Sequence, residues 1–317
     1  MHQHDCMKRR LLYAASQAYE PELETMGRTV GWSERPITVT REVEGRPIDL
    51  ALVGPVDEGV VVAFRGSLPP FFAGRHDGWR VLLDWLADDL ALCVEERTYP
   101  GGVHLGFAEA MQRLWHDADG LPGVRRAVQH FLDAGTPRHL FVTGHGKGGA
   151  LANLFACRAA GLADWRDMGI SVATIAAARV GDGAFARAYA KSRIVCLRYE
   201  VPGDPIPHLP PSAKGPAWAL ALARAAFPLL ETQDYHSVGV AMAAPEATGG
   251  VTARLRQLDA TIRSGVLDWN ALTPSLVAAH AICPKSGYDR LICSGETDGC
   301  SHGETAPSRT GGWKNAA

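Results

Sequence analysis

Apolar residues recur along the chain with two different spacings. Apolar positions at helical spacing predict helices over residues 11–19, 79–86, 107–115 and 124–132, one that passes through 150–155 and one that begins at 184. Short runs of β-forming residues predict strands over residues 37–43, 48–53, 60–64, 139–143, 172–177 and 194–199. Because strands and helices then take turns, the pattern predicts an α/β fold: a mostly parallel central sheet with helices on both faces.

One domain accounts for most of the chain. The 317 residues fit one large α/β unit, and no internal repeat is evident. We expect this domain to span residues 1–293. Residues 294–317 are rich in Ser, Gly and Thr and predict a flexible C-terminal tail.

Composition excludes several classes of protein. Apolar residues make up 46% of the chain and charged residues 21%, which is typical of a globular protein and excludes disorder. Lys and Arg number 32 against 34 Asp and Glu, so no net positive charge favours nucleic acid. No apolar run approaches the ~20 residues of a membrane span, and the start lacks the apolar segment of a signal peptide. We therefore expect the cytoplasm, with signal-independent export left open.

The seven cysteines are scattered and form no C-x-x-C pair. One cluster has ligand types that suit zinc: His280, Cys283, Cys293, Cys300 and His302. Its spacing matches no zinc-finger pattern, and a local disulfide is the favoured alternative. We therefore expect no metal site.

The sequence Gly-His-Gly-Lys-Gly-Gly at residues 144–149 forms a sharp turn between a predicted strand and a predicted helix. Glycines at 144, 146 and 149 satisfy the dinucleotide pattern G-x-G-x-x-G, but the next strand ends without the carboxylate that would bind the ribose. A P-loop would need glycine in place of Phe141 and a hydroxyl in place of Gly148. A nicotinamide-dependent oxidoreductase therefore remains a distant alternative.

A nucleophile elbow fits the turn better. In G-x-S-x-G a serine occupies a strained turn above the sheet, and the flanking glycines let the helix approach the strand. The chain fits at every position except that of the nucleophile, which is Gly146.

Further segments share one resemblance. They are residues 64–67 (Phe-Arg-Gly-Ser), 84–88 (Asp-Trp-Leu-Ala-Asp), 104–107 (His-Leu-Gly-Phe), 148–152 (Gly-Gly-Ala-Leu-Ala), 179–182 (Arg-Val-Gly-Asp), 203–211 (Gly-Asp-Pro-Ile-Pro-His-Leu-Pro-Pro) and 235–239 (Tyr-His-Ser-Val-Gly). In this order they resemble the class 3 lipase family, the fungal-lipase-like branch of the α/β-hydrolases. The resemblance implies an α/β-hydrolase fold and a lipase or esterase that uses a Ser-His-Asp triad.

The resemblance also implies site residues. Gly146 stands at the nucleophile position, Asp204 at that of the triad acid, and His280 is the candidate for the histidine. His236 is the second candidate, because it too follows the acid in the order Ser, Asp, His. The spacing departs from the family pattern, since Tyr288 lies eight residues after His280.

By the same resemblance, Ser67 and Lys147 would form the oxyanion hole through their backbone N–H groups. The alternative for Lys147 is a side chain that covers the first turn of its helix.

Glycine has no hydroxyl, so no acyl-enzyme can form at Gly146 and we expect the chain to be inactive. Glycine fits the strained turn without steric cost, so the fold is expected to persist. We favour an engineered replacement of serine. The alternative is a natural pseudo-hydrolase that binds a ligand or a protein partner.

Two apolar segments bear on the substrate. Phe71 and Phe72 follow the oxyanion residue, where relatives carry a lid, and residues 217–230 form an apolar run with one charge. Core packing is the alternative for both. We expect a lipid or acyl-ester substrate, a transient contact with a membrane or lipid interface, no cofactor and no nucleic-acid partner.

Overall fold

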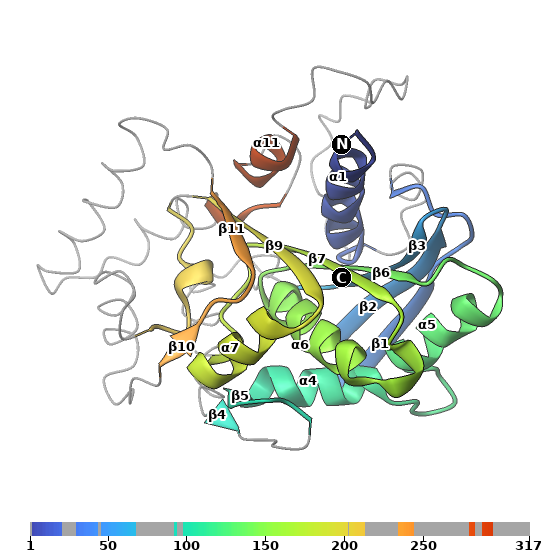
Figure 1. Cartoon of the computed structure of the whole chain (residues 1–317), viewed down its shortest axis with the longest axis horizontal. Helices are drawn as coiled ribbons and strands as arrows, with labels where there is room; N and C mark the ends of the chain where they lie inside the picture. Colours follow the sequence, from blue (N-terminus) through green and yellow to red (C-terminus); the bar gives the residue numbers. More distant parts are fainter. Residues whose placement is uncertain are drawn as a thin grey trace, which may run out of the picture.

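The fold is known from a computed structural model (Figure 1). It describes residues 2–20, 30–43, 46–67, 92–93, 98–201, 203–212, 234–243, 279–282 and 287–293. The predicted helix at 79–86 and the predicted tail at 294–317 lie outside these residues.

A seven-stranded sheet forms the centre of the molecule. Its order is β1 (Ile37–Val43), β2 (Arg46–Val56), β3 (Gly59–Phe64), β6 (His139–His145), β7 (Gly169–Ile175), β9 (Ile194–Glu200) and β11 (Val240–Ala243). The first three strands form an antiparallel meander, and every pairing from β3 to β11 is parallel. The predicted, mostly parallel sheet is therefore confirmed.

A second, smaller sheet consists of two-residue strands. Its order is β10 (Tyr235–His236), β8 (Gly181–Asp182), β5 (Val103–His104) and β4 (Leu92–Cys93), all antiparallel. These strands are too short to produce a periodic pattern, and none of them was predicted.

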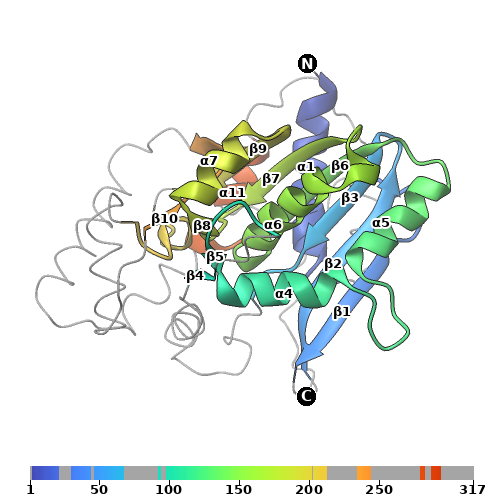
Figure 2. The ribbon, with the colours of Figure 1, turned by 60° about the horizontal axis from the view of Figure 1, so that its bottom comes forward.

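Helices cover both faces of the large sheet (Figures 1 and 2). One face carries α1 (His2–Gln17) and α11 (Gly287–Cys293), and α1 packs against β3, β6 and β7. The other carries α4 (Leu105–Trp115), α5 (Val124–Asp133), α6 (Lys147–Gly161) and α7 (Gly183–Lys191).

Strand β3 shows how one sheet serves two cores. Val60, Val62 and Phe64 join the core under α4, α5 and α6, whereas Val61 and Ala63 join the core under α1 and α11. Successive side chains of a strand point to opposite faces, so a strand covered on both faces must be apolar throughout. All six residues of β3 are buried.

The predicted elements differ from the observed ones mainly at their ends. The helix predicted at 11–19 spans His2–Gln17, and the helix through 150–155 spans Lys147–Gly161. The strand predicted at 172–177 runs over Gly169–Ile175, because Ala176 adopts a positive φ of 51° that ends the extended conformation. Among the described residues, no helix is both long and apolar enough to cross a membrane.

Candidate active site

The turn between β6 and α6 depends on backbone contacts that exclude side chains. A Cβ on Gly144 would overlap the carbonyl of Gly148, and a Cβ on Gly148 would overlap the carbonyl of Phe64 on β3. Glycine at 144 and 148 therefore lets the first turn of α6 lie against the carboxyl ends of β6 and β3.

Gly146 differs from these neighbours. It has φ 57° and ψ −119°, a conformation that strains residues with a Cβ by about 1–3 kcal/mol. A Cβ at this position would meet no backbone atom, but it would lie 3.1 Å from Nε2 and 3.4 Å from Cε1 of His280. A side chain at position 146 would therefore face the imidazole of His280.

His280 is held from its other side by Asp204. The distance between His280 Nδ1 and Asp204 Oδ2 is 2.9 Å, and the carboxylate is fully buried. The Tyr288 hydroxyl donates to the same oxygen at 2.6 Å, and the Ile206 amide donates to Oδ1 at 3.0 Å. Burial raises the pKa of Asp204, but His280 and these two donors outweigh it and hold the pKa below its ordinary value. Asp204 is therefore a buried carboxylate that orients the imidazole.

The second histidine candidate lies elsewhere. His236 belongs to the small sheet, and its Nε2 lies 2.9 Å from Oδ2 of Asp234. The structure thus brings Asp204 together with His280 and does not bring it together with His236.

The two residues expected to form an oxyanion hole both border the elbow. Lys147 begins α6, where N–H groups are free of intrahelical partners. Ser67 lies three residues beyond the end of β3, and its Oγ is buried without a hydrogen-bond partner among the described residues. Gly66 lies against the carbonyl of His145, where a Cβ would approach to 2.5 Å, so this turn adjoins the elbow.

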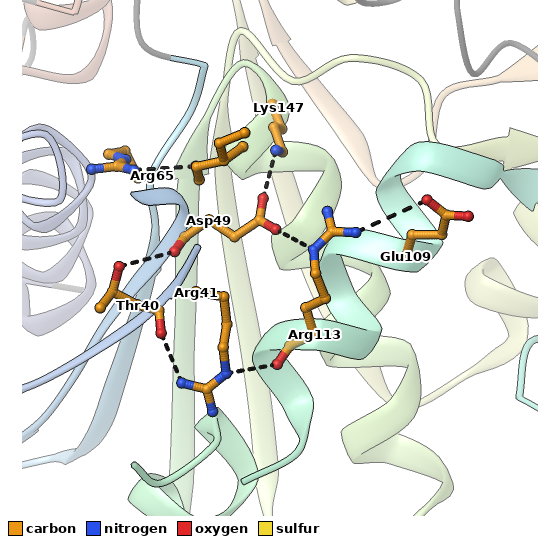
Figure 3. Close-up of polar contacts among 8 residues, drawn as sticks. Thr40, Arg41, Asp49, Arg65, Glu109, Arg113 and Lys147 are labelled. Carbon is orange, nitrogen blue, oxygen red and sulfur yellow. Dashed lines mark hydrogen bonds and ion pairs between the residues drawn. The ribbon is translucent and has the colours of Figure 1, made fainter. Parts of the chain in front are cut away.

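The Lys147 side chain does not cover the first turn of its helix from outside. It is buried, and its Nζ lies 2.7 Å from Oδ1 of Asp49 on β2 (Figure 3). Asp49 is fully buried, and its Oδ2 accepts a hydrogen bond of 2.8 Å from Nε of Arg113 on α4. The carboxylate of Asp49 therefore joins Lys147, at the start of α6, to strand β2 and to α4.

Neighbouring cations anchor the same region to the backbone. Arg65 of the Phe-Arg-Gly-Ser segment donates from Nη2 to the carbonyl of Ile48 at 3.1 Å, and Arg41 donates from Nε to the carbonyl of Arg113 at 3.0 Å (Figure 3). These hydrogen bonds to backbone carbonyls offset part of the cost of burying the two charged groups.

A sequence profile described as lipase (class 3) matches residues 61–214, the segment that contains the elbow and Asp204. Over this segment the chain is similar to the class 3 lipase family.

Solved fungal lipases share the fold. The lipase of Rhizopus microsporus var. chinensis is 18% identical, with a TM-score of 0.55 and coverage of 77% of this chain and 75% of that one. Lipase II of Rhizopus niveus is 19% identical, with a TM-score of 0.53 and coverage of 68% and 78%. A fungal lipase–inhibitor complex is 20% identical, with a TM-score of 0.52 and coverage of 68% and 77%. No curated protein sequence matches the chain.

Several of the residues predicted to take part in the site or in substrate contact fall outside the described residues. They are Phe71, Phe72, the apolar run 217–230, Cys283, Cys300 and His302. Cys293 is described and is a free thiol on α11, with Sγ 3.6 Å from Oδ1 of Asp289. The described residues contain no group of three or more potential metal ligands.

Sequence reasoning missed Asp49 as the partner of Lys147. The two residues are 98 positions apart, and Asp49 lies in an ordinary alternating strand segment. Only the packing of α6 against the sheet brings them together. A buried lysine two residues after the end of a strand does indicate that a carboxylate must be near, but it does not say which one.

The elbow glycines generate a first prediction. We expect Gly148→Ala to lower the free energy of unfolding by several kcal/mol, because its Cβ would overlap the Phe64 carbonyl. Gly161→Ala, at the exposed end of the same helix with open space around the added atom, should be neutral or stabilise by up to about 1 kcal/mol. Urea unfolding measures both, and equal stabilities would contradict the close approach.

The buried ion pair generates a second prediction. Burial raises the pKa of Asp49, but Lys147 and Arg113 outweigh it and leave the pKa below its ordinary value. The ionised carboxylate thus stabilises the fold above the pKa of the unfolded chain, and this contribution is lost as pH falls through the folded-state pKa. Asp49→Asn should therefore cost about 3–5 kcal/mol at pH 7, since Lys147 would lose its countercharge.

The cost of Asp49→Asn should begin to shrink below about pH 4, where the unfolded chain takes up a proton at Asp49, and should be lost as pH falls further through the lowered folded-state pKa. Urea unfolding between pH 3 and 8 measures this dependence. Asp164→Asn, which removes an exposed partner 4.0 Å from Arg125, is the control and should change little. A pH-independent cost below about 1 kcal/mol would show that Asp49 is not a stabilising anion.

Proposed function

We propose that this site is that of a carboxylic ester hydrolase of the Ser-His-Asp type, from which only the nucleophile is missing. One observation carries the proposal: a Cβ at position 146 would lie 3.1 Å from Nε2 of His280 while Nδ1 of that ring is bonded to Asp204. A serine at this position would meet a base that is already oriented.

In such a serine form, each retained group has a task. Serine Oγ would attack the ester carbonyl while His280 Nε2 takes its proton. The imidazolium, stabilised by Asp204, would then return that proton to the leaving alcohol, and water would hydrolyse the acyl-enzyme by the same route. The backbone N–H groups of Ser67 and Lys147 would bind the negatively charged oxygen of both tetrahedral intermediates.

The chain with glycine at position 146 lacks the group that forms the acyl-enzyme. We therefore propose that it does not turn over esters by this route and that the glycine replaces a serine of the parent sequence. Lipid or acyl esters are the proposed substrates, in keeping with the family. An apolar lid at Phe71 and Phe72 and a contact with lipid interfaces belong to the same proposal.

The proposal predicts a gain of function. Gly146→Ser should raise the rate of hydrolysis of short and medium p-nitrophenyl esters by at least about 10³-fold over the parent chain, because triad nucleophiles contribute this much or more. The same change should lower the free energy of unfolding by about 1–3 kcal/mol, because the residue at 146 has a positive φ. Ester hydrolysis and urea unfolding measure the two effects.

Matched variants test the roles of the hydroxyl at position 146 and of the two candidate histidines. Gly146→Ala supplies the Cβ without the hydroxyl and should remain at background. In the Gly146→Ser protein, His280→Gln should abolish the gained activity, whereas His236→Gln should leave it unchanged. If a well-folded Gly146→Ser protein cleaves no ester of any chain length, the hydrolase proposal fails and a ligand-binding role is favoured instead.

A further inference from the structure

Tyr19 approaches the site from a part of the chain that precedes the matched family segment at 61–214. It lies two residues beyond the end of α1, in a turn where its amide donates to the carbonyl of Ser16 at 3.1 Å. Its hydroxyl oxygen lies 2.8 Å from Nδ1 of His145, a buried residue 126 positions away at the end of β6.

His145 in turn holds His280. Its Nε2 lies 2.7 Å from the backbone carbonyl oxygen of His280. The two rings are also packed together, with centroids 4.3 Å apart and planes 34° from parallel. His145 therefore fixes both the main chain and the ring of the residue that receives the proton in the proposed mechanism.

The Tyr19 hydroxyl has a second neighbour. It accepts a hydrogen bond from the backbone amide of Gly66, and a Cβ on Gly66 would overlap the hydroxyl. Gly66 immediately precedes Ser67, so the hydroxyl lies between the turn at residues 65–67, here called the oxyanion turn, and the end of β6.

The hydrogen bonds that link Gly66, Tyr19, His145 and His280 have consistent donors and acceptors. The carbonyl of His280 can only accept, so Nε2 of His145 carries a proton and donates it. Nδ1 is then an acceptor for the Tyr19 hydroxyl, whose oxygen accepts from Gly66. Burial and the adjacent His280 lower the pKa of His145 to about 3, so the ring stays neutral and the hydrogen-bond directions persist over the range in which esterases are assayed.

We propose that Tyr19 and His145 are positioning residues, which set the oxyanion turn and His280 in register with the nucleophile position. Each residue that these hydrogen bonds join lies next to one part of the site or belongs to it: Gly66 precedes Ser67, His145 precedes Gly146, and His280 is the base. The N-terminal helix thereby completes the active site. The expected effect on catalysis rests on the proposed function, whereas the hydrogen bonding of Tyr19 and His145 does not.

The catalytic consequence is tested in the Gly146→Ser protein. Tyr19→Phe removes only the hydroxyl and should lower kcat by about tenfold with KM changed less than twofold, because small misplacements of catalytic groups act on the transition state. His145→Leu should lower kcat further, and His145→Gln, which keeps a donor for the His280 carbonyl, should recover part of that loss.

The matched control is Tyr13→Phe, which removes the hydroxyl of the tyrosine within α1. Tyr13 lies near Arg9, Asp289 and Cys293, and its variant should keep the kcat of the Gly146→Ser protein. If Tyr19→Phe and Tyr13→Phe have the same kcat, or if His145→Leu changes KM alone, the positioning role is overturned.

The structural content is tested in the unaltered chain, independently of any activity. Long-range ¹H–¹⁵N correlation spectra of ¹⁵N-histidine-labelled protein, with His145 assigned by His145→Gln, should show a proton on Nε2 and none on Nδ1 from pH 8 to pH 5. Tyr19→Phe should shift the Nδ1 resonance. An Nδ1–H tautomer, or a ring that becomes cationic near pH 6.5, would overturn the inference even if Gly146→Ser is an active esterase.

Discussion

The close backbone approach between α6 and the sheet is the constraint on which the site depends. Gly144 and Gly148 leave no room for side chains, and Gly146 between them adopts a positive φ at which a Cβ would face His280. The same contact carries Lys147 to Asp49 and brings the turn after β3 to the elbow. The conformation of Gly146, which would strain any residue with a Cβ, is thus held by packing that spans three strands and a helix.

Around this fixed turn, the fold assembles groups from distant parts of the chain. Asp204 follows β9, His280 comes from a late segment, and Tyr19 follows the first helix. Parallel strands end at a common edge of the sheet, which explains why the loops that follow them converge there. Hydrogen bonds join Asp204 to His280 and Tyr288, and join His145 to His280 and Tyr19, so these side chains are held in place around position 146.

The sequence predicted the central sheet because long buried strands have a clear apolar pattern, and the strand predicted at 37–43 coincides with β1. It also singled out Gly146, Asp204 and His280, which the structure brings together. It could not predict Asp49 or Tyr19 as contributors, because hydrogen bonds across 98 and 126 residues leave no local pattern. The two-residue strands of the small sheet were not predicted for a related reason: they are defined by pairing rather than by periodicity.

Covalent labelling tests the central claim most directly. A p-nitrophenyl alkylphosphonate reacts with a serine that is activated by a histidine and stabilised by an oxyanion hole, and intact-mass spectrometry counts the adducts. The account predicts one adduct on the Gly146→Ser protein at position 146, none on the unaltered chain, and none when His280→Gln is added. Equal labelling of the unaltered chain, or a folded Gly146→Ser protein that stays unlabelled, would contradict the claim that this site lacks only its nucleophile.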